Sequence, residues 1–394
     1  MPIPVRGSFN PSGSAAGGPG ILPGPEPAAV DEQATAQAMW AVVFAGGIGS
    51  RFWPLSSPRR PKPLLALVTG RSLLEDTVGR LQPMIEPDRV LVLTSRDIAP
   101  AIRSAIREIP EQNVLVEARP LGTAAALAWG AQEVARRAGP TTPVCAMHAD
   151  LAIGFPGAFR ESLRRAAITA TRERALVALG VRATRPEPSF GYLALGDALD
   201  PDQPLAAGGA YHVAEFVEKP DERRAATLAG DGALWHAGII VGTAKTVLEK
   251  LARYTPEIEP GLYALSRGNL PAFVEQIRSV SIERGLLERA SRFLVMLADV
   301  GWDDVGTWAS LRRARELDDD GNGALGDVHF ADSTGNVVHS ETGTVVLYGV
   351  SNLLVVNLDG LTFVTTIERA RDLKPLLDAL PGNMRVDPSG GRAK

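Results

Sequence analysis

The sequence predicts an α/β protein with a mostly parallel mixed sheet, followed by a small all-β unit. Strand-like and helix-like segments alternate from residue 41 to about residue 311, which is typical of a sheet covered by helices. The first segment is apolar and leads directly into a glycine-rich turn. From residue 322 to about residue 366 the pattern changes to short β-rich runs separated by turns such as TGN, ETG and LDG.

Hydrophobic periodicity predicts the individual elements in chain order. Apolar runs predict strands at 41–45, 89–95, 113–117 and 143–150, and helical spacing predicts helices at 72–81, 98–109, 122–138 and 156–171. A strand, a polar turn and a second strand are expected within 174–196. Helical patterns continue to about residue 290, and residues 367–380 predict a closing amphipathic helix.

Composition and charge exclude several classes of function. The 394 residues carry a net charge of −4 and lack the basic excess that is typical of nucleic-acid binding. No apolar run is long enough to span a membrane. The single cysteine, Cys145, excludes an internal disulfide and lies in the apolar run PVCAM, so we expect a buried thiol and not a nucleophile. These features fit a protein of the reducing cytoplasm.

The two ends of the chain differ from its centre. Residues 1–38 are rich in Gly, Pro, Ala and Ser and show no periodicity, which predicts a disordered extension without the apolar segment of a signal peptide. Met39 stands directly before the first strand, and our hypothesis is that it is the natural start. Residues 381–394 are expected to form a tail.

Residues 40–65 are the most informative stretch of the chain. A short buried strand is followed at once by Gly46, Gly47 and Gly49, then by Arg51 and, eleven residues later, by Lys62. Glycines after a buried strand allow backbone N–H groups to approach an anion, and Arg51 and Lys62 add two cations. The loop therefore favours phosphate binding over a tight turn with solvated side chains.

A second set of candidates follows from the rule that ligands bind at the carboxyl ends of sheet strands. This rule places the loop 46–51, the turn 120–123 and Asp150 on one rim. Asp150 is a candidate Mg²⁺ ligand, because Mg²⁺ prefers carboxylates together with phosphate oxygens and water, but it could equally cap the next helix. Thr123 could cap helix 122–138, and the start of that helix could also approach a nucleotide.

Three strings carry a resemblance to a known family. They are GG-x-G-x-R-F-W-P-L-S with PKPLL, then FVEKP at 216–220, and VGWDDVGTW at 300–308. Together they resemble the sugar-1-phosphate nucleotidylyltransferases, and FWPLS is similar to the mannose-1-phosphate guanylyltransferase branch. The resemblance implies a Rossmann-like nucleotidylyltransferase catalytic domain at 39–320 and a C-terminal β-helix-like domain with a terminal helix at 321–380.

The resemblance also implies a role for each matching residue. The expected nucleotide-binding residues are Gly46, Gly47, Gly49, Arg51, Lys62, Gly122 and Thr123. The expected sugar-phosphate-binding residues are Gly191, Glu218, Lys219 and His236. The expected metal ligands are Asp150 and Asp304, and the catalytic set is Arg51, Lys62, Asp150 and Asp304. Asp303 is the local competitor of Asp304, because it stands where the family often has Ser or Asn.

The implied reaction is the attack of mannose 1-phosphate on the α-phosphorus of GTP, giving GDP-mannose and pyrophosphate. Mg²⁺ is the expected cofactor and would bridge the two substrates. No protein nucleophile is needed, because the attacking phosphate is already ionised. Nucleic acid and membrane are not expected as partners, and a homodimer is an open option.

Several motifs depart from the family pattern. The turn PLGT replaces Arg-Asn-Thr, and His236 stands where an Asn usually helps to hold the sugar. His148 precedes Asp150 where Pro is usual, and a lone His at a strand end favours a surface position. These departures leave dTTP or UTP with glucose 1-phosphate as alternative substrates.

Two alternatives change the class of function. One is a non-catalytic regulatory subunit that binds a sugar nucleotide, which the retained Arg51, Lys62, Asp150 and Asp304 disfavour. The other is a dinucleotide-binding oxidoreductase, which is disfavoured because Phe52 stands where its fingerprint needs a glycine.

Overall fold

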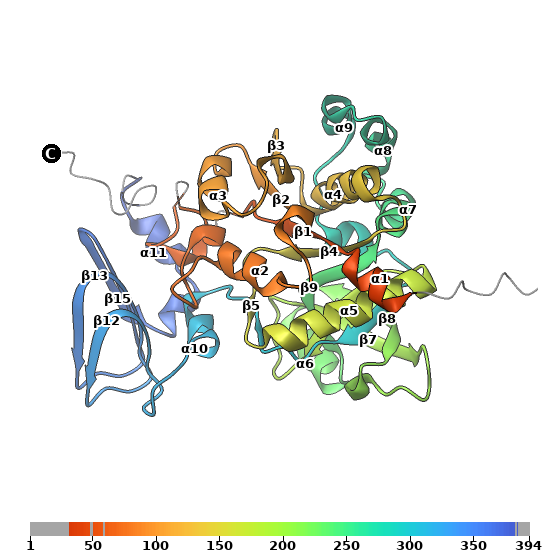
Figure 1. Ribbon diagram of the computed structural model, residues 1–394. Helices are drawn as coiled ribbons and strands as arrows, with labels where there is room; N and C mark the ends of the chain where they lie inside the picture. The colour runs from red at the N-terminus through yellow and green to blue at the C-terminus, as the bar shows by residue number, and fades with distance from the viewer. Residues whose placement is uncertain (1–30, 48–49, 58–59, 383, 385–394) are drawn as a thin grey trace, which may run out of the picture.

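The computed structural model describes residues 31–47, 50–57, 60–382 and 384. The chain forms a large α/β unit followed by a smaller β unit, drawn in blue in Figure 1. The short helix α10 (Leu311–Ala314) lies between them in the chain. The fold class expected from the sequence is confirmed.

The large unit is built on a nine-stranded sheet with the order β3-β2-β1-β4-β9-β6-β10-β8-β7. Its strands are β1 (Trp40–Phe44), β2 (Val90–Ser95), β3 (Val114–Glu117), β4 (Pro143–His148), β6 (Val177–Arg182), β7 (Gly191–Ala198), β8 (Ala210–Glu218), β9 (Leu234–Thr243) and β10 (Leu294–Leu297). Strands β3, β2, β1 and β4 are mutually parallel, whereas β8 and β9 run against the remaining strands. The carboxyl ends of the parallel strands therefore meet at one edge.

Helices cover both faces of this sheet (Figure 1). They are α1 (Glu32–Gln37), α2 (Leu73–Leu81), α3 (Ala99–Ala105), α4 (Thr123–Ala138), α5 (Pro156–Glu173), α6 (Glu222–Gly230), α7 (Ala244–Tyr254), α8 (Glu259–Ser266) and α9 (Leu270–Gln276). Because side chains alternate along a strand, β1 supplies Ala41 and Val43 to the core under α2, α3 and α5. Its Val42 and Phe44 enter the core under α4 and α7.

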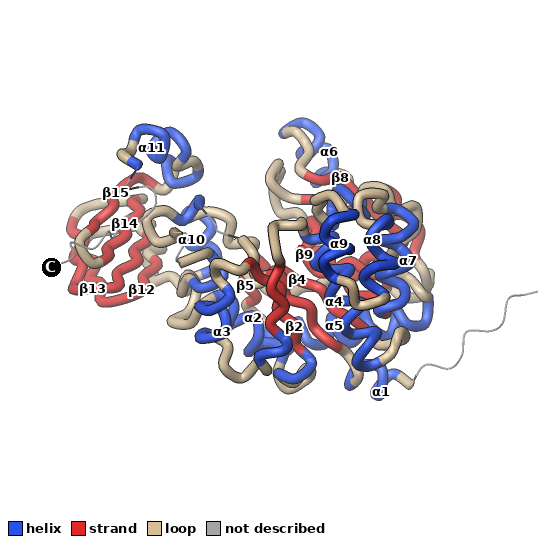
Figure 2. The backbone as a smooth tube through the Cα atoms, turned by 90° about the horizontal axis from the view of Figure 1, so that it is seen from above, coloured by secondary structure: helices blue, strands red, loops and turns tan. Residues whose placement is uncertain are grey.

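The small unit, shown in Figure 2, is a four-stranded sheet of β12 (Gly323–Ala331), β13 (Val337–Tyr348), β14 (Leu353–Leu358) and β15 (Leu361–Thr366). The first three strands are parallel although short turns connect them, so the chain coils as in a β-helix, and β15 returns antiparallel. The expected closing helix is present as the short α11 (Lys374–Ala379).

The segment that carries the glycine-loop signature packs against residues of both units. Phe52 and Leu65 lie fully buried in one core with Trp308 and with Val337 of the small unit. The indole of Trp308 donates a hydrogen bond to the Trp53 carbonyl at 3.0 Å. The C-terminal unit therefore supports the same loop that carries Arg51 and Lys62.

The N-terminal expectation is wrong in its last part. Residues 1–30 lie outside the described residues, but α1 forms within the stretch 1–38 that the sequence predicted to be disordered. The Asp31 carboxylate caps α1 by accepting a hydrogen bond from the Ala34 N–H at 2.9 Å. The Asp followed by good helix formers was a local signal, but the Gly- and Pro-rich sequence before it obscured that signal.

The thiol of Cys145 is buried in β4, as expected, and burial raises its pKa to about 12. Most of the expected tail 381–394 lies outside the described residues. Within the described part of the chain, no helix has the length and apolar character that crossing a membrane requires.

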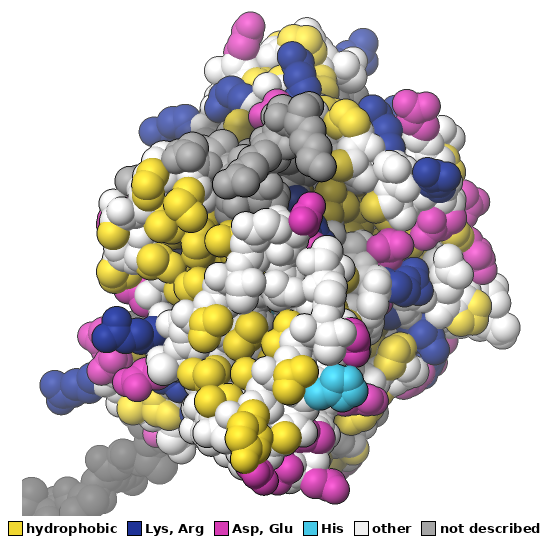
Figure 3. Space-filling model, turned by 90° about the vertical axis from the view of Figure 1, so that its left-hand side faces the viewer, with side chains coloured by type: hydrophobic (Ala, Val, Ile, Leu, Met, Phe, Trp, Pro, Cys, Tyr) yellow, Lys and Arg dark blue, Asp and Glu magenta, His cyan; other side chains and the backbone are white. Residues whose placement is uncertain are grey.

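One face of the small unit is apolar. Figure 3 shows hydrophobic side chains gathered there, and the large exposed ones on its strands are Val346, Tyr348 and Val364. Such a patch is compatible with a protein interface. The homodimer stays a prediction.

Candidate active site

A cleft of about 720 Å³ opens where β1 and β4 end. The predicted site residues that line it are Arg51, Lys62, Asp150, Gly191, Glu218, Lys219, His236 and Asp304. These residues come from separate segments of the large unit. The fold therefore brings together most of the side chains that the sequence singled out.

Lys62 joins the two candidate metal ligands. It begins the short 3₁₀ turn Lys62–Leu64, which Pro61 and Pro63 stiffen, and its side chain is only 9% exposed. Its Nζ lies 2.8 Å from Oδ2 of Asp150 and donates to the Asp304 carbonyl at 3.3 Å. One buried cation is thus shared by the segments that carry both carboxylates.

Asp150 follows β4 directly and faces the cleft. Burial acts to raise the pKa of its carboxyl group, but Lys62 and His148 outweigh burial, so the pKa lies below its usual range. The alternative role as a helix cap does not occur, because Phe155 occupies the N-cap position of α5. Asp150 is therefore an ionised carboxylate held at the cleft.

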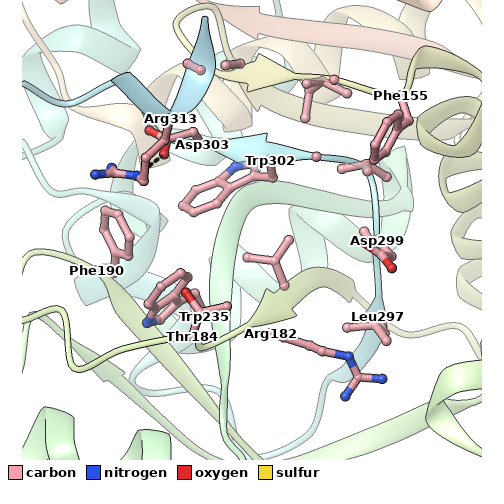
Figure 4. Close-up of a pocket in the computed structure, with 18 of the residues that line it drawn as sticks. Phe155, Arg182, Thr184, Phe190, Trp235, Leu297, Asp299, Trp302, Asp303 and Arg313 are labelled. Carbon is pink, nitrogen blue, oxygen red and sulfur yellow. Dashed lines mark hydrogen bonds and ion pairs between the residues drawn. The ribbon is translucent and has the colours of Figure 1, made fainter. Parts of the chain in front are cut away.

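Asp303 and Asp304 face different spaces, although they are neighbours in the chain. Asp304 lines the cleft, whereas Asp303 lines a second pocket of about 550 Å³, in which it pairs with Arg313 at 2.7 Å (Figure 4). Trp302 lines both spaces and separates them. Burial and the nearby Asp303 raise the pKa of Asp304 to about 6, and Lys62 partly counteracts them.

The donor set at this end of the cleft fits Mg²⁺. Asp150 and Asp304 offer hard carboxylate oxygens, and substrate phosphates would complete the coordination. The raised pKa of Asp304 indicates that its negative charge lacks full compensation by the protein. Among the described residues, no group of three or more His, Cys, Asp or Glu side chains is arranged to hold a metal. The described part of the protein alone does not build a complete metal cage.

Gly191, Glu218 and Lys219 form one corner of the cleft. Gly191 and Glu218 are partners in the β7–β8 register, and a Cβ on Gly191 would lie 2.9 Å from Oε2 of Glu218. Lys219 has a left-handed backbone with φ 52°, and its Nζ pairs with Oε1 of Glu218 at 2.6 Å. The absent side chain at Gly191 leaves open the space in front of the Glu218 carboxylate.

Two histidines and Glu283 line the cleft near this corner. His236 is buried, its Nε2 has no partner among the described residues, and burial lowers its pKa to about 4. His148 is partly exposed, as a surface position requires, but it lines the cleft and lies 3.9 Å from Glu283. Burial opposes ionisation of Glu283, but His148 outweighs burial and lowers the Glu283 pKa to about 2.

The glycine loop lies beside Glu117, which the sequence reasoning missed. Glu117 ends β3 at the same edge of the sheet, and a Cβ on Gly46 would lie 3.9 Å from its Oε2. Its Oε1 has no partner among the described residues, and burial raises its pKa to about 7. Gly47 has open space around it, and Gly49 lies outside the described residues. An acid at a strand end was the available signal, as for Asp150.

Gly122 and Thr123 are not lining residues of the cleft but support its wall. Gly122 has φ 83°, and a Cβ there would lie 2.4 Å from the Val280 carbonyl oxygen. The Thr123 hydroxyl accepts a hydrogen bond from the Ile282 N–H at 2.9 Å and does not cap α4. Both residues hold the segment that precedes Glu283.

The fold and this cleft define a class of enzyme. The family model described as nucleotidyl transferase matches residues 40–321, well over half of the chain. The chain belongs to the nucleotidyl transferase family, which excludes the oxidoreductase alternative.

Several known proteins resemble this chain over most of its length. The alginate biosynthesis protein AlgA of Pseudomonas putida is 31% identical over 89% of this chain and 73% of its own length. The mannose-1-phosphate guanylyltransferase of Klebsiella pneumoniae is 30% identical over 88% of this chain and 74% of its own length. A crystal structure described as a mannose-1-phosphate geranyltransferase from Thermus thermophilus has a TM-score of 0.76 and 33% identity, covering 86% of this chain and 98% of that chain.

Proposed function

We propose that the protein transfers the guanylyl group of GTP to mannose 1-phosphate, giving GDP-mannose and pyrophosphate. The observation that carries the proposal is the single cleft that holds Lys62 with Asp150 and Asp304 beside the Glu218–Lys219 pair. Relatives named mannose-1-phosphate guanylyltransferase support the choice of substrates.

The chemistry is a direct displacement at phosphorus. A phosphate oxygen of mannose 1-phosphate forms a bond to the α-phosphorus of GTP. The bond from that phosphorus to the oxygen bridging to the β-phosphate breaks, and pyrophosphate leaves with the electron pair. Because the nucleophile arrives ionised, the protein has to position two anions and neutralise their charge.

The cationic side chains of the cleft perform this neutralisation. Arg51 and Lys62 stabilise the triphosphate and the departing pyrophosphate, and Lys219 holds the phosphate of the sugar. Asp150 and Asp304 would hold Mg²⁺, which supplies charge neutralisation and Lewis acidity when bound. Lys62 also lowers the pKa of Asp150, which keeps that carboxylate ionised at neutral pH.

Glu117 favours guanine over pyrimidine bases. The Watson–Crick edge of guanine presents two adjacent donors, N1–H and the 2-amino group, and a carboxylate accepts both. Uracil and thymine present one donor flanked by acceptor oxygens, which a carboxylate would repel. Oε2 of Glu117 lies toward Gly46 of the glycine loop, whereas Oε1 is buried, so Oε2 is the oxygen that would accept from guanine.

The experiment that tests the function is pyrophosphate release with Mg²⁺, in which GTP, dTTP, UTP and ATP are crossed with mannose 1-phosphate and glucose 1-phosphate. We expect pyrophosphate release above background to be confined to GTP with mannose 1-phosphate, or to be by far fastest with that pair. A preference for UTP or dTTP with glucose 1-phosphate would overturn the proposed substrates. Folded protein that is silent with every pair would instead support the regulatory subunit.

A further inference from the structure

His148, His236 and Glu283 form a polar cluster that the proposed reaction leaves largely unused. The side chains of His148 and Glu283 are 33% and 16% exposed, and His236 as a residue is 7% exposed. All three line the cleft that also holds Lys62 and Lys219. Glu283 and His148 are therefore accessible to a bound substrate.

One buried atom of this cluster has no hydrogen-bond partner among the described residues. That atom is Nε2 of His236, and the ring stands edge-on to Phe216 with centroids 5.6 Å apart. The Glu283 carboxylate has His148 Nε2 at 3.9 Å, which is longer than a hydrogen bond. Buried polar atoms of this kind are costly unless something else satisfies them.

The segment before Glu283 is held rigidly. The Val280 carbonyl accepts a hydrogen bond from the Ala124 N–H at 3.2 Å, and the Ile282 N–H donates to Thr123 at 2.9 Å. Glu283 then begins a single π-helical turn, Glu283–Leu287, and such turns are frequent at functional sites. The backbone that carries Glu283 is therefore tied to the start of α4.

We propose that Glu283 binds a hydroxyl group of the hexose ring and determines sugar specificity, beside His236, which the family resemblance already assigns to the sugar. This inference rests on the proposed function and deepens it. A sugar hydroxyl can donate to the Glu283 carboxylate, which lines the cleft and is 16% exposed, whereas Nε2 of His236 is buried and out of a ligand's reach in this conformation. His148 acts as a positioning residue, because its Nε2 faces the Glu283 carboxylate at 3.9 Å.

The test compares the wild type with Glu283→Gln, which keeps the shape but removes the charge. KM is measured for mannose 1-phosphate at saturating GTP, and for GTP at saturating mannose 1-phosphate. We expect the KM for mannose 1-phosphate to rise about 10- to 100-fold, the range for a lost hydrogen bond to a charged group. The KM for GTP should change less than about threefold. Glu275→Gln, on the exposed side of α9, is the matched control and should match the wild type.

Mannose 1-phosphates that each lack one hydroxyl identify the contact itself. The deoxy sugar that lacks the hydroxyl bound by Glu283 should bind the wild type more weakly. For that sugar alone, Glu283→Gln should cause little further loss of affinity. A purely structural role would not produce this selective non-additivity.

Thermal melts establish that the variants are folded. If Glu283→Gln melts below the assay temperature, Glu283→Asp keeps the charge at a shorter reach and should show the same selective rise in KM. Losses that are additive for every deoxy sugar, or equal rises in both KM values, would overturn the inference while leaving the proposed function intact. A wild type that neither turns over nor binds any hexose 1-phosphate would overturn both.

Discussion

Replacing Glu117 by Gln should stabilise the protein while weakening its selectivity for GTP. Burial raises the pKa of Glu117 from 4.5 to about 7, with a small opposing effect of the Leu121 backbone. Because the folded-state pKa lies above the unfolded one, ionised Glu117 destabilises the fold. The destabilisation begins near pH 4.5, grows as the pH rises and is complete above about pH 7.

The size of the effect follows from the same values. A rise from 4.5 to about 7 corresponds to at most ~3.4 kcal/mol at 1.36 kcal/mol per pH unit. The side chain is partly exposed, and solvent screening reduces the expected gain for Glu117→Gln to about 1–2 kcal/mol. The gain should appear at pH 8 and nearly vanish at pH 5. Stability gained at the expense of function is common at binding sites.

The functional change has a defined direction. A Gln amide presents one acceptor and one donor, which matches uracil better than the paired donors of guanine. We expect kcat/KM for GTP to fall about 10- to 100-fold at pH 8, and the ratio of UTP to GTP turnover to rise. The KM for GTP should also rise in the wild type as the pH falls below 7, because Glu117 then becomes protonated.

Urea unfolding at pH 5 and 8 and pyrophosphate release with GTP and UTP measure both effects. Glu108→Gln, an exposed change in the preceding loop, is the control and should alter neither. An unchanged free energy of unfolding at pH 8 would refute the burial argument. An unchanged UTP to GTP ratio would refute the assignment of Glu117 to the base.

Three further predictions concern the metal end of the cleft and the contact between the two units. Lys62→Ala should lower kcat about 10²–10³-fold, because it removes a preorganised cation, and near-normal turnover would contradict this role. Asp304→Asn should raise the Mg²⁺ concentration needed for half-maximal activity at least about tenfold. Asp303→Asn should not, because Asp303 faces Arg313. Equal effects of the two variants in a Mg²⁺ titration would argue against assigning the metal to Asp304 alone of the two. The pKa of Glu341 falls to about 2, because its His and Arg partners outweigh the opposing effect of burial. The stabilisation of the fold by ionised Glu341 is therefore complete above pH 4.5 and is lost as the pH falls toward 2. Glu341→Gln should therefore lower the free energy of unfolding at pH 7 by roughly 1 kcal/mol after solvent screening, and a loss that persists undiminished at pH 3 would refute the pairing.

Local sequence was sufficient for most of the fold. Where the sequence analysis predicted ranges in the large unit, strands and helices lie within a few residues of them, because each buries one periodic apolar face against a single sheet, whereas α6, β8, β9 and β10 had no predicted range. The exception is α1, which buries little apolar surface of its own and sits in a Gly- and Pro-rich context. The wall formed by residues 279–284 also had no local signal, because distant hydrogen bonds to Thr123 and Ala124 hold it.

The sequence by itself determined the chemical inventory of the protein: the glycine loop, the cations Arg51 and Lys62, and the acids after the strands. Only the tertiary structure decided which acids face the cleft. Asp303 and Asp304 are adjacent in the chain, yet one pairs with Arg313 and the other lines the cleft with Lys62. Glu117 and Glu283 resemble ordinary surface acids until the fold removes them from water. Spacing along a chain fixes which residues are available, whereas burial and partner distance, which arise from packing between distant segments, fix what each residue can do.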